Sequence, residues 1–118
     1  LKRIEKIGMI STAYFTFPAQ DCSLDDVREF LQTIQKQNPG LYLAFQVDAS
    51  KVNFIVSLDK SFIDNIALSE LKVLLQQNYG LVGGGSSMMI QGSGAAMTID
   101  NIKKLYQEVK TWLQAKKM

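Results

Sequence analysis

The sequence predicts one domain of the α/β (α+β) class, in which three helices pack on a mixed sheet of four or five strands. Three observations support this prediction. Apolar and β-branched runs of strand length recur, apolar residues return at helical spacing in three other segments, and the segments follow the order β-α-β-β-α-β-α. A chain of 118 residues is long enough for one domain with a real core and too short for two.

The N-terminal segment is expected to begin as helix and to continue as a strand. Apolar residues recur every three positions at the start of the chain, so residues 1–9 predict the end of a connecting helix that stops at Gly8. Residues 10–17 are mostly β-branched or aromatic and precede Pro18, which predicts a strand. Residues 10–118 are then expected to form the domain.

The next segment carries the start signal of a helix. Ser23 followed by Asp26 matches a capping box, in which the two side chains accept from each other's backbone N–H groups. Apolar residues then recur at helical spacing through residues 24–37, and Asn38-Pro39-Gly40 is expected to end this helix.

Two strands follow, and they are expected to form a hairpin. Residues 41–47 are a nearly continuous apolar run, typical of a central strand, and residues 52–58 follow after a short polar connection. The helix between residues 10–17 and residues 41–47 makes a crossover connection, so these two strands are predicted to be parallel. The hairpin then adds an antiparallel neighbour.

The C-terminal part predicts two helices around a glycine-rich segment. A leucine stripe predicts a helix over residues 67–79, which Gly80 would end. Residues 83–94 hold five of the eight glycines and are expected to form a loop and a short strand. The last helix starts at Thr98 and has an apolar stripe at three- and four-residue spacing.

The composition excludes several kinds of catalytic site. The chain has no histidine, which removes the commonest general base, the usual base of a catalytic triad and the commonest metal ligand. A lone Cys22 cannot form an internal disulfide or a thiolate zinc cage. We therefore expect no catalytic residue and no metal site in this chain.

Charge and hydropathy indicate the kind of partner and the cellular environment to expect. The net charge is +2, but residues 11–100 carry five basic and nine acidic residues, so the excess of positive charge lies at the two ends of the chain. This distribution suggests either a basic face for an anionic partner or a solvated terminal helix. No apolar run approaches the roughly 18 residues of a membrane span, and no signal peptide is visible. We expect a soluble, cytoplasmic protein with no membrane contact. The sequence begins at Leu1 rather than Met, which suggests a piece of a longer chain.

The glycine-rich segment is the main functional signal. Glycine lets the backbone approach a ligand closely, and consecutive free N–H groups in such turns bind anions. The segment fails as a P-loop because Ser86 replaces the essential lysine, and it fails as a dinucleotide fingerprint because methionine takes the third glycine position. It predicts a contact to phosphate or ribose, with a plain helix-to-strand turn as the alternative.

The same segment resembles the signature of the DHH-associated domain. In the C-terminal (C-Ala) domain of alanyl-tRNA synthetases this signature runs Gly-Gly-Gly-Arg-Pro-Asp-Met-Ala-Gln-x-Gly-Gly. The matching positions in this chain are Gly83, Gly84, Gly85, Met89, Gln91 and Gly94. Ser93 stands in place of a glycine, Ser86 in place of the family's Arg or Lys, and Met88 in place of its Asp. The resemblance covers residues 10–118.

The resemblance implies a non-catalytic, tRNA-binding module of an alanine–tRNA ligase. Such a module grips the elbow of tRNA-Ala and couples aminoacylation with editing by other domains of the same chain. It needs no cofactor of its own, because ATP and zinc would belong to those other domains. The nucleic-acid-binding residues that it implies are Gly83, Gly84, Gly85, Ser86, Ser87, Gln91 and Gly94.

Three lysines of the last helix are a second candidate contact. Lys103, Lys110 and Lys117 lie seven residues apart, so one helical stripe could follow a phosphate backbone and make binding sensitive to salt. An ordinary solvated helix face is the alternative. Tyr79, beside the glycine-rich segment, could stack on an unpaired base or belong to the core.

Two other functions stay open. The chain could be the substrate-binding domain of a DHH-superfamily phosphoesterase, although the glycine motif of those enzymes usually carries a histidine that this chain lacks. It could instead mediate dimerisation, with a second copy as its partner and the glycines only shaping a turn. Apolar residues within residues 1–7 would suit that role.

Overall fold

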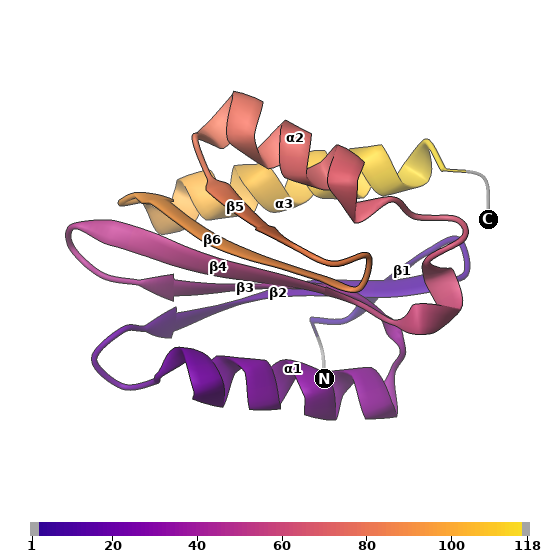
Figure 1. Cartoon of the computed structure of the whole chain (residues 1–118), viewed down its shortest axis with the longest axis horizontal. Helices are drawn as coiled ribbons and strands as arrows, with labels where there is room; N and C mark the ends of the chain where they lie inside the picture. The colour runs from indigo at the N-terminus through magenta and orange to yellow at the C-terminus, as the bar shows by residue number, and fades with distance from the viewer. Residues whose placement is uncertain (1–2, 117–118) are drawn as a thin grey trace.

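The structure is a computed structural model that describes residues 3–116, and it is built on a six-stranded sheet (Figure 1). The strands are β1 (Glu5–Ile7), β2 (Ile10–Pro18), β3 (Gly40–Val47), β4 (Lys51–Leu58), β5 (Val82–Gly85) and β6 (Met89–Ala95). The helices are α1 (Leu24–Gln37), α2 (Leu68–Tyr79) and α3 (Ile99–Gln114), with a 3-10 turn, η1 (Lys60–Phe62), before α2.

The sheet is mixed, as the sequence predicts. Its strand order is β1-β2-β3-β4-β6-β5. β2 and β3 are parallel and are joined by α1, whereas β3 and β4 form the predicted antiparallel hairpin. β6 pairs antiparallel with β4, and β5 forms the outer edge beside β6. The predicted fold class and its three helices are therefore confirmed.

Two short strands bring the sheet to six strands rather than the four or five predicted. β5 consists largely of glycine, which has little strand preference by itself, so the sequence predicts a loop there. β1 lies where the sequence predicts the last turns of a helix, and that prediction is wrong for residues 5–7. Gly8 has a φ of 62° and, with Met9, turns the chain into a hairpin from Ile7 to Ile10 instead of ending a helix. Leu1 lies outside the described residues.

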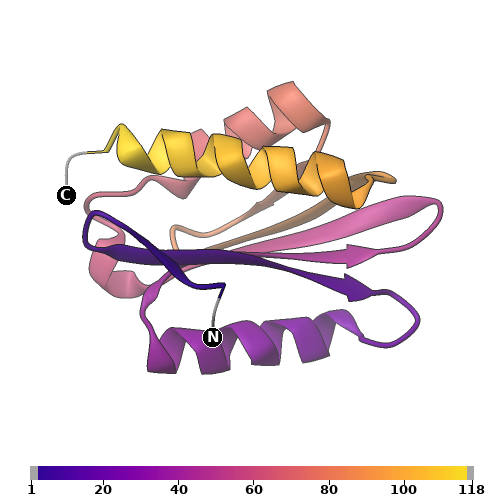
Figure 2. The ribbon, with the colours of Figure 1, turned by 180° about the vertical axis from the view of Figure 1, so that it is seen from behind.

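The helices cover both faces of the sheet. α1 lies on one face, and α2 and α3 lie on the other (Figures 1 and 2). Because side chains alternate across a strand, the sheet divides the core into two clusters. The smaller cluster, under α1, includes Leu31 and Tyr42, and the larger one, under α2 and α3, includes Phe45, Leu71 and Leu105.

The helix limits follow capping chemistry. Ser23 Oγ accepts from the Asp26 N–H at 3.1 Å, and Asp26 Oδ2 accepts from the Ser23 N–H at 3.2 Å, which confirms the predicted capping box. Gly80 ends α2 in the left-handed conformation, with a φ of 67°. Thr98 caps α3 by accepting from the Asn101 N–H at 3.1 Å. No helix within residues 3–116 combines the length and apolar character needed to cross a membrane.

A polar cluster joins β1 to α3. The Tyr106 hydroxyl donates to Glu5 Oε2 at 2.6 Å, and Lys110 Nζ lies 3.1 Å from the same oxygen. The hydrogen bonds from Tyr106 and Lys110 lower the pKa of Glu5. Burial, together with the bond to Glu5, raises the pKa of Tyr106. The sheet edge at β1 is therefore held to α3 by a charged group that stays ionised into the acid range.

Replacing Glu5 with Gln should lower stability by about 0.5–1 kcal/mol near pH 7. A carboxylate with a lowered folded pKa stabilises the fold above its unfolded pKa of about 4.3, and this contribution is lost as the pH falls through the folded pKa. The variant should therefore approach the wild type in stability as the solution is acidified. Urea denaturation across the acid range measures this, with Glu29→Gln on the exposed side of α1 as the control. Identical pH profiles for the wild type and Glu5→Gln would contradict the prediction.

Candidate nucleic-acid interface

The glycine-rich segment forms a hairpin at the free edge of the sheet. Its register pairs Gly83 with Gly92 and Gly84 with Gln91. The chain enters β5 from α2 through the turn at Gly80, and the side chain of Leu81, which follows the turn, is buried. β5 is the last strand in the sheet, so no strand within residues 3–116 pairs with its outer side.

The ladder of hydrogen bonds determines which backbone groups of β5 face outward. The Ser86 N–H donates to Met89 O at 2.8 Å, and directly bonded pairs alternate along an antiparallel ladder. By this alternation the Gly84–Gln91 pair is bonded across the hairpin. The N–H and C=O groups of Gly83 and Gly85 then point toward the free edge. That edge offers backbone donors and acceptors with no side chain of their own in front of them.

The four glycines at positions paired between β5 and β6 have different reasons to be glycine. A Cβ on Gly83, Gly85 or Gly92 would lie 2.0–2.2 Å from a backbone oxygen of the opposite strand. These three must lack a side chain for the strands to approach each other. A Cβ on Gly84 would meet nothing within 4 Å, and the φ of Gly84 is not positive. The fold therefore does not explain why this position is glycine.

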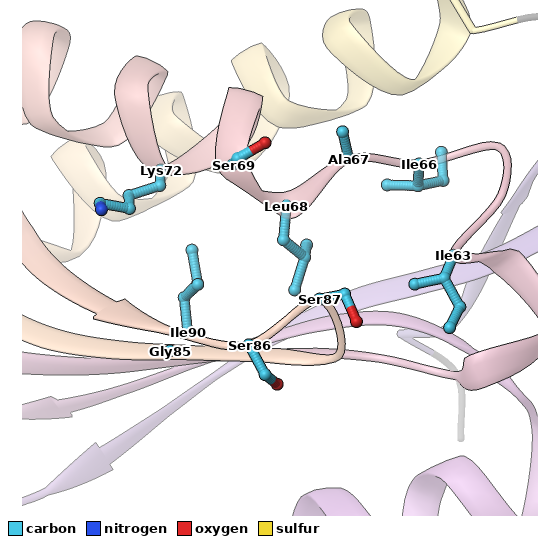
Figure 3. Close-up of a pocket in the computed structure, with 10 residues that line it drawn as sticks. All are labelled: Ile63, Ile66, Ala67, Leu68, Ser69, Lys72, Gly85, Ser86, Ser87 and Ile90. Atoms are coloured by element: carbon cyan, nitrogen blue, oxygen red, sulfur yellow. The ribbon is translucent and has the colours of Figure 1, made fainter.

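A pocket of about 380 Å³ lies between the start of α2 and the turn of the hairpin (Figure 3). Its polar lining includes Ser69 and Lys72 from α2 and Ser87 from the turn. Leu68 and Ile90 contribute apolar side chains to the same pocket. The α2 side of the hairpin thus offers one cation, two hydroxyl groups and an apolar lining.

The α1 side of the hairpin carries a different set of groups. Arg28 of α1 donates from Nε and Nη2 to Gln91 Oε1, at 3.1 and 2.7 Å, and its Nη1 lies 2.5 Å from Asp25 Oδ1. The side chain of Ser86 points away from α2 in Figure 3, and its Oγ accepts from the Met88 N–H at 3.2 Å. Ser86 and Gln91 therefore lie on the α1 side of the hairpin.

The structure brings most of the predicted contact residues together, because they belong to one hairpin. Those on the hairpin are Gly83, Gly84, Gly85, Ser86, Ser87, Gln91 and Gly94. Gly94 lies near the end of β6, where it pairs with Val52 of β4. These residues surround a sheet edge rather than the irregular loop that the sequence predicts at its start.

The predicted lysines lie on another element, α3, and they differ from one another. Lys103 is exposed and forms no ion pair within residues 3–116. The side chain of Lys110 is only 17% exposed, because it pairs with Glu5 and lies 5.0 Å from the centre of the Tyr106 ring. Lys117 lies outside the described residues. The predicted stripe therefore presents one free cation in the part of α3 that the structure describes.

Tyr79 does not stand free beside the hairpin. Its ring packs against the larger core cluster, and its hydroxyl donates to Glu108 Oε1 at 2.8 Å. Burial and the neighbouring Glu108 raise the pKa of Tyr79 to about 12. The structure favours the core alternative for this residue over base stacking.

Arg28 is a functional candidate for which the sequence carries no signal. It directly follows the buried Val27 and is separated from Gln91 by 63 positions in the chain. Only the crossover that lays α1 against the sheet brings its guanidinium over β6. Among residues 3–116, no group of three or more His, Cys, Asp or Glu side chains is placed to hold a metal ion.

The comparison with solved structures identifies the fold. No protein-family model matches the sequence, and no curated protein sequence matches it significantly. The structure is similar to the crystal structure of the C-Ala domain from Aquifex aeolicus alanyl-tRNA synthetase, with a TM-score of 0.80 and 18% sequence identity. The match covers 95% of this chain and 98% of that one. The chain therefore has the C-Ala fold, which agrees with the resemblance seen in its glycine signature.

Proposed function

We propose that this chain is the tRNA-binding C-terminal module of an alanyl-tRNA synthetase. One observation carries the proposal: the glycine signature of that module forms the free edge of the sheet in a chain with the C-Ala fold. The signature and the fold support each other as separate observations. Two chains that share a fold at 18% identity need not share this signature.

The hairpin suits a partner whose surface is rich in hydrogen-bond acceptors. Backbone N–H groups are common ligands of RNA phosphate oxygens, and the N–H groups of Gly83 and Gly85 face outward with no side chain to hinder them. Lys72 beside the hairpin and Lys103 on α3 add positive charge. Such a surface positions RNA and performs no chemistry on it.

We propose that the RNA is tRNA-Ala and that the module holds its elbow, the outer corner of the L. Holding that corner would keep one bound tRNA available to the aminoacylation and editing domains of the same cytoplasmic synthetase. The module needs no cofactor for this role, and ATP and zinc would be bound by the other domains.

Fluorescence anisotropy with a labelled tRNA-Ala transcript tests this proposal. We expect about tenfold weaker binding to a minihelix of the acceptor and T arms, which lacks the elbow. Binding should weaken with salt along a negative log–log slope, and Lys103→Glu should weaken it further. The control is Lys6→Glu, which reverses an exposed charge on β1 at the opposite edge of the sheet.

Other outcomes would support the alternatives. Failure to bind tRNA at low salt, together with a concentration-dependent dimer in sedimentation, would favour a dimerisation domain. Equal binding to single-stranded oligonucleotides and to tRNA would favour the substrate-binding domain of a phosphoesterase.

A further inference from the structure

We propose that Arg28 orients the Gln91 amide as an RNA-contacting group, so that the RNA lies on the α1 side of the hairpin. The inference rests on the proposed tRNA binding. It adds to that function the face of the hairpin that RNA contacts and a positioning residue on a different element.

The Arg28 guanidinium fixes which way the Gln91 amide points. A guanidinium has only donors, so it can bond the amide oxygen and not the amide nitrogen. Both Nε and Nη2 of Arg28 donate to Gln91 Oε1. The Gln91 Nε2 group is therefore turned away from Arg28, and it forms no hydrogen bond within residues 3–116.

Arg28 also keeps donors for a partner. Of the five N–H donors of an arginine, two are used on Gln91 and one on Asp25. The Arg28 side chain is 33% exposed, so part of it is open to solvent. Asp25, whose side chain is 92% exposed, leaves the charge of this group only partly compensated.

Gly84 keeps the Gln91 amide accessible. The two residues are paired across the hairpin, and their side-chain positions lie on the same face of the sheet. A side chain at residue 84 would have its Cβ about 4.5–5.5 Å from that of Gln91 and would extend beside the Gln91 side chain. The structure has open space there and no need for glycine in its own backbone. Access to Gln91 is thus a reason for this glycine.

The free groups on this face select the chemistry of the ligand. Beside the hairpin, Gln91 Nε2 and the remaining Arg28 N–H groups are donors, and the Arg28 groups belong to a cation. The carboxylates of Asp25 and Glu29 line the same pocket as Arg28 further along α1. RNA presents phosphate oxygens, base carbonyls and ring nitrogens, which are acceptors with negative charge close by. A peptide strand alternates donors and acceptors, so it matches this surface less well. The α2 side has a single lysine and two serine hydroxyl groups beside an apolar lining.

Binding of the labelled tRNA-Ala transcript to Arg28→Ala tests the inference. We expect about fivefold weaker binding and a salt slope reduced by about one, because a charged hydrogen-bonding group is lost. Lys36→Ala, which removes the same charge two turns further along α1 and away from the hairpin bonds, should change binding less than about twofold. Arg28→Lys keeps the charge but loses the paired hydrogen bonds from Nε and Nη2 to Gln91. Compared with Arg28→Ala, it should therefore restore the salt slope more than the affinity.

A double-mutant cycle shows whether Arg28 acts through Gln91. Gln91→Ala should also weaken binding, and the double variant should bind more tightly than the two separate losses predict. Amide NMR of the wild type adds a readout that does not depend on any variant folding. Addition of tRNA should shift Gly84 and the Gln91 side-chain amide more than Ser69 and Lys72.

The two levels of the proposal fail in different ways. If the wild type binds tRNA-Ala, Arg28→Ala behaves like Lys36→Ala, and the largest shifts are at Ser69 and Lys72, then RNA lies on the α2 side. The inference is then wrong and the proposed function stands. If the wild type does not bind tRNA at low salt, the proposed function itself fails.

Discussion

Replacing Gly83 with Ala should destabilise the fold by about 2–4 kcal/mol, whereas the same change at Gly84 should be neutral or mildly stabilising. The methyl group added at residue 83 would lie 2.2 Å from a backbone oxygen and 2.7 Å from the Gly92 Cα. Backbone atoms of a paired strand cannot rotate away, so β5 would have to separate from β6. At residue 84 the methyl group meets nothing within 4 Å. Alanine there limits the unfolded chain and should stabilise by up to about 1 kcal/mol.

Urea denaturation of the two variants measures this difference. The two positions are adjacent, lie in the same strand and receive the same side chain, so each variant is the control for the other. Equal destabilisation at both positions would contradict the close approach at Gly83. The hydrogen-exchange rate of the Gln91 backbone N–H should also rise in Gly83→Ala and stay unchanged in Gly84→Ala, because only the first variant opens the β5–β6 ladder.

Gly84→Val should keep the fold and weaken binding of tRNA-Ala by tenfold or more, that is by about 1.4 kcal/mol. Valine is well accommodated in an exposed strand, and the space beside residue 84 is open. Its two methyl groups would cover the Gln91 amide and keep RNA away from the bare β5 backbone. Both contacts to RNA would then be lost together.

Anisotropy with the labelled transcript, run beside a denaturation curve, tests this second prediction. Gly84→Ala should give an intermediate loss of affinity, because one methyl group covers less of the amide. The control is Val82→Ala, which changes an exposed residue of the same strand without adding bulk. Wild-type affinity in a folded Gly84→Val variant would show that RNA does not contact this face of the hairpin.

The elements that the sequence predicts correctly are those with a strong local pattern. The capping box at Ser23, the apolar stripes of the three helices and the run at residues 41–47 each require one structure whatever the rest of the chain does. The parallel pairing of β2 and β3 follows from a general rule of handedness. These patterns are sufficient to determine the fold class.

The two strands that the sequence does not predict have weak local signals. β1 has three residues, and apolar residues three apart in such a short stretch do not separate helix from strand. β5 is made mostly of glycine, and it is a strand because β6 provides hydrogen bonds to it. In both cases the neighbouring strand decides the conformation, because an isolated strand gains no hydrogen bonds of its own.

The candidate site also has features that the sequence indicates and features that only the tertiary structure shows. By itself, the sequence determined the fold class and singled out residues 83–94 as the candidate contact segment, because its glycines are close together and carry a recognisable spacing. The tertiary structure alone decided that Arg28 meets Gln91, that Lys110 is held by Glu5, and that Gly84 is a glycine the fold does not need. The physical reason is distance along the chain. Backbone preferences act over a few residues, whereas a hydrogen bond between positions 28 and 91 exists only after α1 has packed against the finished sheet.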